Sequence, residues 1–527
     1  MSGKGWVPYA VFCALVVVLV AVLRFSGALQ VVMHPPVITV PPPVASAGYV
    51  PPPTREQLEG FLGRVRQAET ITDPLQRCLS YPDPPNSRWR PEVVAAYCRF
   101  YTQPTLSFDD VRQLIRSGHA KQLDQRLEQA LQAQITQPDA RGRLDRIFQN
   151  AFENPSADAR ATLDAWKQAD PDSAFAYAAS GDAYASMAAE ARGGDFIQNT
   201  PEAALVAMTH LAEKAEVDLR HAIALDPRLT PAYGTMMDIA RMAFGRDKAL
   251  AAEAAGLQQS PGDYYLYFSA IILAEPKWGG SIDELNALAR QARAQAARYP
   301  LLYLAANDAD SRTFNFYNCR SCDHPTSLAR IESALLHASN VPMLESAGHT
   351  MGRAGRQDLA VVYTSEAIRF ADSPLDRLDR AYQLAKLGHP AWAHQQFEAL
   401  LPELPGRGDV YRGLGFADIK LRQDDRAVGE LQQAMQLDRT DIWSQATLGE
   451  IYARQKKWGQ AWAIADQLIQ EKPDMPDGWC LRADVQMGQP RAGLADTEQA
   501  FAQRFGNRPD QQGELRRIRD ALAHGAR

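Results

Sequence analysis

A pattern that recurs every 34 residues constrains this chain more than any other feature of its sequence. Leu414-Gly415 recurs as Leu448-Gly449, and Ala427 recurs as Ala461, each 34 positions later. Small residues at such positions let two helices of one unit approach closely, while leucine fills the space against the next unit. Because one helical hairpin cannot bury its apolar face alone, such units must stack. The pattern therefore predicts an all-α solenoid of helical hairpins.

The second copy resembles the tetratricopeptide repeat (TPR). It carries Leu448-Gly449 and Tyr452, followed by Ala461 and Pro473, at the spacings of the L-G-x2-Y, A and P signature. A generic alanine-rich bundle would not keep one register over several units, as this sequence does. The resemblance implies a TPR-type α-solenoid whose first helices form a concave binding surface.

A second stretch in the same register lies further upstream. Tyr177, Gly181 and Tyr184 occupy signature positions of a first helix, and Ala215 occupies the matching position of a second helix. These two small residues are 34 positions apart, although about 12 separate them in a regular unit. The sequence therefore predicts an insertion that begins at Arg192-Gly193-Gly194.

Four local sequences within residues 75–340 resemble an uncharacterised bacterial family of TPR-like proteins that contain a domain of unknown function. They are CLSYPDPP around Cys78, AYC ending at Cys98, the insertion at Arg192-Gly193-Gly194 and the turn Trp278-Gly279-Gly280. This resemblance implies an architecture of helical repeats with insertions. It supplies no activity.

The N-terminal residues predict a membrane anchor. Trp6 to Leu23 is an 18-residue run without charge, long enough as a helix to cross a bilayer. Ala45-Ser46-Ala47 resembles a signal-peptidase site, but it lies far beyond the apolar run, so an uncleaved signal anchor over residues 6–30 is favoured. Lys4 before the run favours a cytoplasmic N-terminus. We therefore expect a single-pass protein of the bacterial inner membrane with most of its chain in the periplasm.

A proline-rich linker should follow this anchor, because eight prolines and no charged residue lie between His34 and Thr54. The remaining domain boundaries are placed where the repeat pattern begins, ends or is interrupted. The sequence predicts a cytoplasmic N-terminus (1–5), an anchor (6–30), a linker (31–54), a helical N-terminal region (55–172), TPR-like repeats (173–340, irregular at 192–209 and 300–337), a regular TPR array (341–509) and a C-terminal capping helix (510–527).

The spacing of the cysteines is compatible with several chemical states. Cys78 and Cys98 flank a proline-rich loop with little apolar content, and a disulfide between them would hold that loop. For Cys319 and Cys322 a structural disulfide is favoured, whereas reduced thiols, a zinc site with His324 and a redox pair are the alternatives. Cys480 follows Trp479 and reads as a small buried apolar residue.

The sequence points away from catalysis and from nucleic acid. The net charge of −6 gives no basic field for phosphate backbones. Glu345-Ser346 matches the catalytic dipeptide of lytic transglycosylases, but the rest of that motif is missing, and no P-loop, GxSxG or HExxH occurs. We therefore expect no enzyme, no cofactor, no catalytic metal and no small-molecule substrate.

Because the sequence points away from catalysis and nucleic acid, we expect the chain to bind a protein or a peptide. In the TPR register, Tyr382, Phe416, Ile419, Trp443 and Glu450 face the concave surface of successive first helices. The Lys and Asn of the co-chaperone carboxylate clamp are missing, so a chaperone tail is a poor candidate. The sequence predicts a membrane-anchored, envelope-facing scaffold or assembly factor; the alternative is a periplasmic peptidoglycan-acting enzyme or its accessory subunit. The alternative interpretation is that Leu375, Leu378 and Phe416 pack between helices, and unfolding of a Tyr382/Trp443 double variant would place these two aromatic residues in the core as well.

Overall fold

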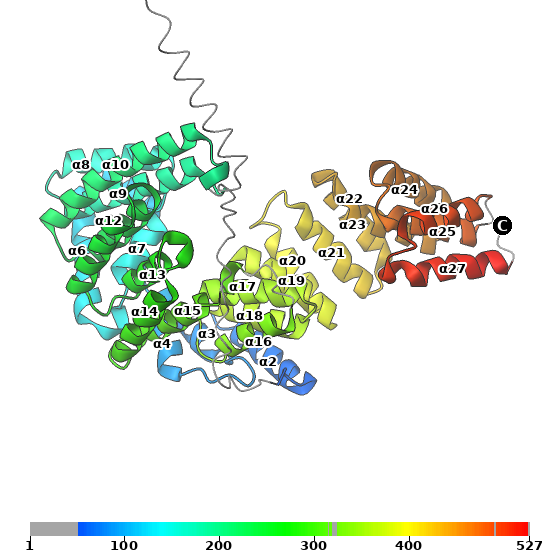
Figure 1. Ribbon diagram of the computed structural model, residues 1–527, viewed down its shortest axis with the longest axis horizontal. Coiled ribbons are helices and arrows are strands. Elements are labelled where there is room, and N and C mark those ends of the chain that lie inside the picture. The colour runs from blue at the N-terminus through cyan, green and yellow to red at the C-terminus, as the bar shows by residue number, and fades with distance from the viewer. Residues whose placement is uncertain (1–50, 196, 315, 319–323, 490–491, 525–527) are drawn as a thin grey trace, which may run out of the picture. The chain divides into compact units, whose positions relative to one another are not determined.

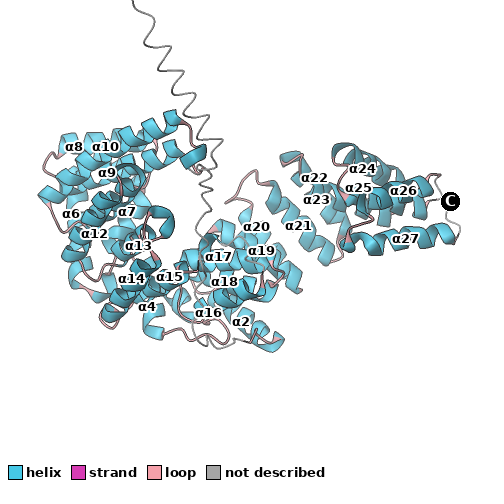
Figure 2. Cartoon of the chain, viewed as in Figure 1, coloured by secondary structure: helices cyan, strands magenta, loops and turns pink. Residues whose placement is uncertain are grey.

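A computed structural model describes residues 51–195, 197–314, 316–318, 324–489 and 492–524. The chain divides into two units, residues 1–47 and 48–527, and every described residue belongs to the second. Within these ranges the chain is helix and loop throughout, with no strand (Figure 2). The predicted all-α class is thus confirmed for the described part of the chain.

The predicted localisation requires correction. None of the helices between residues 51 and 524 that the structure describes is long and apolar enough to cross a membrane. This finding contradicts the expectation of a single-pass inner-membrane protein with its bulk in the periplasm. The predicted anchor at 6–30, and the predicted linker up to residue 50, lie outside the described residues.

The first part of the described chain forms seven α-helices. Polar side chains cap several of them; for example, Thr54 accepts a hydrogen bond from the backbone of Gln57 in a capping box, and Ser107 does the same with Asp110. The helices are α2 (Arg55–Ala68), α3 (Pro74–Ser80), α4 (Pro91–Thr102), α5 (Phe108–Arg116), α6 (Ala120–Thr136), α7 (Arg143–Ala151) and α8 (Ala157–Ala169).

The middle part contains longer and less regular hairpins (Figure 1). Its helices are α9 (Ala174–Arg192), α10 (Glu202–Leu225), α11 (Thr230–Ile239), α12 (Arg246–Gln259), α13 (Tyr264–Leu273), α14 (Ile282–Gln295), α15 (Leu302–Arg312) and α16 (Pro325–Ala334). The predicted irregular segment 192–209 is only partly irregular, because α10 begins at Glu202 and buries Met208 against α9. Likewise α15 and α16 occupy much of the predicted irregular segment 300–337.

The C-terminal part is a series of regular hairpins, in which each second helix packs against the first helix of the next hairpin. First helices begin at Pro374, Gly408, Ile442 and Pro476, each 34 positions after the one before. The helices are α17 (Val341–Arg353), α18 (Gln357–Phe370), α19 (Pro374–Leu387), α20 (Pro390–Leu400), α21 (Gly408–Lys420), α22 (Asp424–Leu437), α23 (Ile442–Arg454), α24 (Trp458–Glu471), α25 (Pro476–Gly488), α26 (Leu494–Phe505) and α27 (Gln512–Ala523). The predicted TPR-like helical repeat is confirmed.

Small residues sit where these helices approach most closely. Ala427 and Ala461 are fully buried. A Cβ atom at Gly415 would meet the Leu431 side chain at 2.9 Å, and a Cβ at Gly449 would meet Leu481 of the next hairpin at 2.2 Å. The 34-residue pattern therefore marks helix contacts within and between units.

Replacing Gly449 by leucine should lower the free energy of unfolding of the C-terminal hairpins by about 1–3 kcal/mol, because the added atoms force side chains and backbone apart. Chemical denaturation followed by circular dichroism measures this change. Gly459→Leu on α24 is the matched control, since a Cβ there meets nothing within 4 Å. Equal stability of the two variants would contradict the assigned register.

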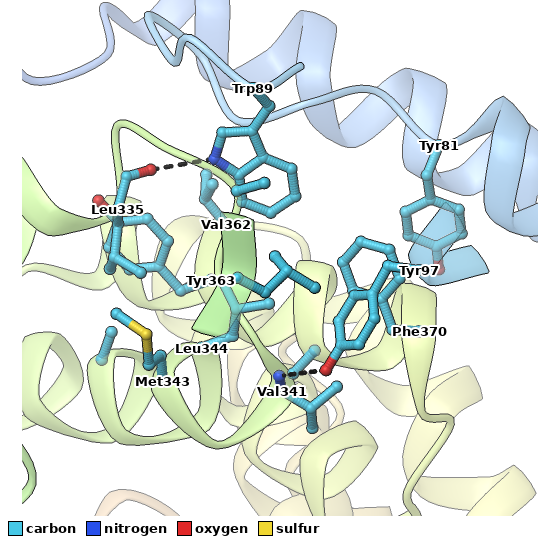
Figure 3. Close-up of a cluster of buried hydrophobic side chains, with 14 of the residues drawn as sticks. Tyr81, Trp89, Tyr97, Leu335, Val341, Met343, Leu344, Val362, Tyr363 and Phe370 are labelled. Carbon is cyan, nitrogen blue, oxygen red and sulfur yellow. Dashed lines mark hydrogen bonds between the residues drawn. The ribbon is translucent and has the colours of Figure 1, made fainter. Parts of the chain in front are cut away.

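The N-terminal helices pack on repeats that lie far away in the sequence. Trp89 Nε1 donates a hydrogen bond to the carbonyl oxygen of Leu335 (3.1 Å), and the Tyr97 hydroxyl accepts one from the backbone of Val341 (3.0 Å), as Figure 3 shows. The ring of Tyr97 lies 4.6 Å from that of Phe370. Helices α2 to α4 therefore share a core with α16 to α18, whereas α5 to α8 share one with α9 and α10.

A disulfide and a buried ion cluster complete this contact. Cys78 and Cys98 are joined by a disulfide, with Cα atoms 5.7 Å apart. Arg369 of α18 donates hydrogen bonds to the Cys78 carbonyl oxygen (2.8 Å) and to Asp83 (2.8 Å), and it pairs with the fully buried Glu366 (3.1 Å). Arg369 thus adds a further link between the disulfide-bonded segment and the repeat array.

Candidate functional site

The predicted binding residues lie on first helices of three successive hairpins. Tyr382 is on α19, Phe416 and Ile419 are on α21, and Trp443 and Glu450 are on α23. The ring of Phe416 lies 6.4 Å from that of Tyr382 and 5.8 Å from that of Trp443. These three rings form a continuous row, which we call the aromatic strip. The structure therefore brings the predicted aromatic residues together.

Tyr382 is half-buried and makes hydrogen bonds to the next hairpin. Its hydroxyl donates a hydrogen bond to the carbonyl oxygen of Asp409 (2.6 Å) and accepts one from Arg412 (3.2 Å). Its ring packs 5.0 Å from that of Phe397 on α20. Burial raises the pKa of Tyr382 to about 12, while the neighbouring Arg412 lowers it. Tyr382 thus holds α19 against α20 and α21.

Trp443 is the accessible member of the strip. It is 41% exposed, whereas Phe416 and Ile419 are half-buried. Lys420 lies 5.4 Å from the Phe416 ring, and Ile419 packs on the core of α22 to α24. Large exposed aromatic side chains contribute much of the energy of protein interfaces. The strip therefore grades from packing at Tyr382 to an open contact surface at Trp443.

Carboxyl groups gather upstream of the strip, on α17 and α19. Burial raises the pKa of Asp376 to about 7, and the carboxylates of Glu345 and Asp379 act in the same direction. Burial also raises the pKa of Glu345 and of Asp379. His349 Nε2 lies 3.4 Å from Asp379 Oδ2, and His349 lowers the pKa of Asp379. We call Glu345, Asp376 and Asp379 the upstream acidic group.

A second set of carboxyl groups lies downstream of Trp443, on α23 and α25. Partial desolvation raises the pKa of the exposed Glu450, and the carboxylates of Asp484 and Asp477 raise it further. Arg517 of α27 forms an ion pair with Asp484, with 2.6 Å between Nη2 and Oδ1. We call Glu450, Asp477 and Asp484 the downstream acidic group. Negative charge thus flanks the aromatic strip on both sides along the array.

The sequence pattern placed Glu450 on the concave surface, but it predicted neither the downstream nor the upstream carboxyl groups as a group. Glu345 was considered only as a catalytic residue, and Asp376 and Asp379 were not considered. A signal was present, because Asp376 and Asp379 are three residues apart and so share a helix face. What the sequence did not reveal is that α17 and α19 place Glu345 and Asp376 beside each other.

The structure describes three of the five cysteines discussed above. Cys78 and Cys98 are buried and joined by a disulfide, away from the aromatic strip. Cys319 and Cys322 lie outside the described residues, so their state stays a prediction. Cys480 is a half-buried free thiol beside Asp477 and Asp484, and burial together with nearby carboxylates raises its pKa to about 12. In the ranges that the structure describes, no group of three or more His, Cys, Asp or Glu could hold a metal ion.

One protein family matches part of the chain. Residues 107–256 match the family described as Domain of unknown function (DUF4034), which is well under half of the 527 residues. This match bears out the resemblance to a domain-of-unknown-function family over that part of residues 75–340. No match to a curated protein was found.

Several solved TPR structures match the chain at low sequence identity and low TM-score. A tetratricopeptide repeat protein from Parabacteroides merdae has 13% identity and a TM-score of 0.34, over 53% of this chain and 92% of that one. Yeast Tom70 has 12% identity and a TM-score of 0.33, over 79% and 94%. YrrB, described as a TPR protein with an unusual peptide-binding site, has 16% identity and a TM-score of 0.25, over 43% and 95%.

Proposed function

We propose that this chain is a non-enzymatic scaffold or assembly factor that binds a protein partner along the first helices of its C-terminal hairpins. TPR arrays are in general scaffolds for protein–protein interaction. The observation that carries the proposal is the position of Trp443, which is 41% exposed at the open end of a row of three aromatic rings. An exposed indole in such a row supplies the kind of anchor that protein interfaces use.

The carboxyl groups on both sides of the aromatic strip indicate which kind of partner segment the strip binds. Both acidic groups contain carboxyl groups whose pKa values are raised by burial and by neighbouring acids. A cationic side chain placed between these carboxylates would relieve their repulsion, whereas an acidic segment would increase it. We therefore propose that the partner contributes a segment in which basic residues flank an aromatic or aliphatic residue.

Selection of peptides from a random phage-displayed library on the full chain tests this proposal. The expected ligands combine Lys or Arg with an apolar anchor, and their affinity should fall as salt is added, because exposed charges are screened. Trp443→Gln should weaken the selected peptide by about 2 kcal/mol or more, roughly 30-fold, without lowering the melting temperature.

The matched control is Leu437→Gln. Leu437 is also 41% exposed and apolar, but it lies on the second helix α22. This variant should bind the selected peptide as the wild type does. Equal loss in both variants, or selected peptides without basic residues, would contradict the proposed site.

Glu345 is not proposed as a catalytic residue. Burial raises the pKa of Glu345 and of Asp376, and the charge of Glu345 raises the pKa of Asp376 further. The upstream acidic group instead suits the recognition of a cation on the partner. Release of muropeptides from peptidoglycan by the purified chain, lost in Glu345→Gln, would overturn this part of the proposal.

A further inference from the structure

A cavity of about 680 Å³ lies well outside the aromatic strip, among the N-terminal and middle helices. One side is formed by α4, by the end of α6 and by the turn between α6 and α7. The other side is formed by three loops that join successive hairpins, at residues 228–230, 259–264 and 298–301. Its volume lies within the range of small-molecule sites in proteins, about 300–1,000 Å³.

Four arginines from four different segments line this cavity. Arg99 pairs with Asp139 (3.3 Å), and Arg228 pairs with Asp226 (2.6 Å) and Glu128 (3.4 Å). Arg141 and Arg298 differ from these two, because neither has a carboxylate within 4 Å in the described part of the chain. Their guanidinium groups instead lie 4.9 Å and 5.3 Å from the centre of the Tyr299 ring. Two arginines without an ion-pair partner, one from each side of the cavity, therefore lie beside the same ring.

Arg141 is held in place by the protein rather than by solvent. Its Nη1 donates a hydrogen bond to the carbonyl oxygen of Gln134 (3.3 Å), and the Tyr299 ring supports its plane. An arginine that is oriented in advance loses less conformational entropy when it pairs with an anion. Its remaining N–H groups are the natural donors for a carboxylate or a phosphate.

A buried hydrogen-bond network fixes the inner surface of the cavity. The Gln134 amide donates to the Thr230 hydroxyl (2.9 Å), which donates to Asp145 (2.6 Å), and the backbone of Leu144 donates to the Gln134 amide oxygen (2.7 Å). Asp263, which lines the cavity, caps α13 through the backbone of Leu266 (3.0 Å). Burial and mutual repulsion raise the pKa of Asp145, and burial raises that of Asp263. Arg141 opposes this effect, because its positive charge lowers the pKa of Asp263.

Apolar side chains also line the cavity. Ile135 is 44% exposed although it is a large aliphatic residue, and it lines the cavity together with Pro138, Pro261 and Leu301. An aliphatic side chain that is exposed inside a cavity is available for contact with a ligand. The site thus offers two arginines without an ion-pair partner together with apolar surface.

We propose that this cavity binds an organic anion in which a carboxylate or phosphate monoester is carried on an apolar body. Arg141 and Arg298 bind the anionic group, and Ile135 with the neighbouring prolines contacts the apolar body. The site is independent of the aromatic strip, so a ligand here and a protein partner there can bind at the same time.

Isothermal titration of the full chain with four probes tests the proposal. The anionic probes are 3-phenylpropionate and phenyl phosphate, whose relative affinities distinguish a carboxylate from a phosphate ligand. Two further probes are the controls. 3-Phenylpropionamide has the apolar body without the charge, and inorganic phosphate has the charge without the apolar body. At least one anionic probe should bind about tenfold more tightly than both controls, as expected for a charge-assisted pair supported by apolar contact.

Arg298→Gln and Arg141→Gln should each weaken the better probe about tenfold or more. Arg290→Gln is the matched control, because Arg290 is exposed on α14 and does not line the cavity. Arg298 is itself exposed, so its variant should keep the wild-type melting temperature and report on binding alone. Equal binding of the amide, no effect of Arg298→Gln, or no binding of either anionic probe at about 10 mM would overturn the proposal.

Discussion

Replacing Arg369 by methionine should lower the free energy of unfolding by about 3–5 kcal/mol at pH 9, because the change leaves the carboxylate of Glu366 buried without its cation. Glu366 is fully buried, and Arg369 is the only cation paired with it within the described ranges. The variant also removes two hydrogen bonds, to the Cys78 carbonyl oxygen and to Asp83. Urea unfolding at several pH values measures the loss.

The loss should depend on pH in a defined direction. Burial raises the pKa of Glu366 from an ordinary value of 4.5 to about 8, while Arg369 lowers it. Removing Arg369 therefore raises this pKa further. A carboxyl group with a raised folded-state pKa destabilises the fold increasingly as the pH rises from its unfolded pKa to its folded pKa. The loss should thus be smaller at pH 5 than at pH 9.

Two controls separate the buried pair from a general effect of losing an arginine. Arg369→Met combined with Glu366→Gln should recover much of the loss, because no buried charge remains. Arg454→Met removes an exposed ion pair with Asp424 and should cost less than about 1 kcal/mol. A loss in Arg369→Met that is independent of pH and is not reduced in the double variant would contradict the buried pair.

Replacing both Cys78 and Cys98 by serine should cost about 3 kcal/mol. The bridge closes a loop with a sequence separation of 20, and an open loop of that length has more freedom in the unfolded chain. Both sulfur atoms are buried in the core shared by α3, α4 and α18, so the serine hydroxyls add a desolvation cost. Guanidinium unfolding without reductant measures the difference from the wild type.

Cys480→Ser is the control for loss of a cysteine that is not bridged. It should change stability by less than the double variant, because Cys480 is only half-buried. Adding a reductant should lower the stability of the wild type toward that of the Cys78→Ser/Cys98→Ser variant. If the double variant matches the wild type without reductant, the two cysteines do not stabilise the fold as a bridge.

Much of the C-terminal fold could be predicted from the sequence, because its signal is local. The spacing of Gly415, Gly449, Ala427 and Ala461 reports helix contacts within one hairpin or between adjacent ones. Such contacts involve residues that are close in the sequence, and they recur with the repeat. The position of Trp443 at an accessible place on a first helix followed from the same register.

Contacts between distant segments could not be predicted in this way. Nothing in the sequence indicates that Tyr97 bonds to the backbone of Val341, or that Arg369 bonds to the Cys78 carbonyl oxygen. The sequence left open whether Tyr382 packs between helices for a related reason, since its hydrogen bonds go to the Asp409 carbonyl oxygen and to Arg412 in the next hairpin. The helical start of α10 within a segment predicted to be irregular reflects packing on α9.

The most direct test of the proposed function is photo-crosslinking from two positions of one hairpin. A benzophenone amino acid placed at Trp443 reports on the first helix α23, and the same group at the exposed Gln467 reports on the second helix α24. The basic, apolar-anchored peptide selected on the full chain should crosslink to position 443 and not to position 467. Crosslinking at position 467 equal to or stronger than that at position 443 would contradict binding along the first helices.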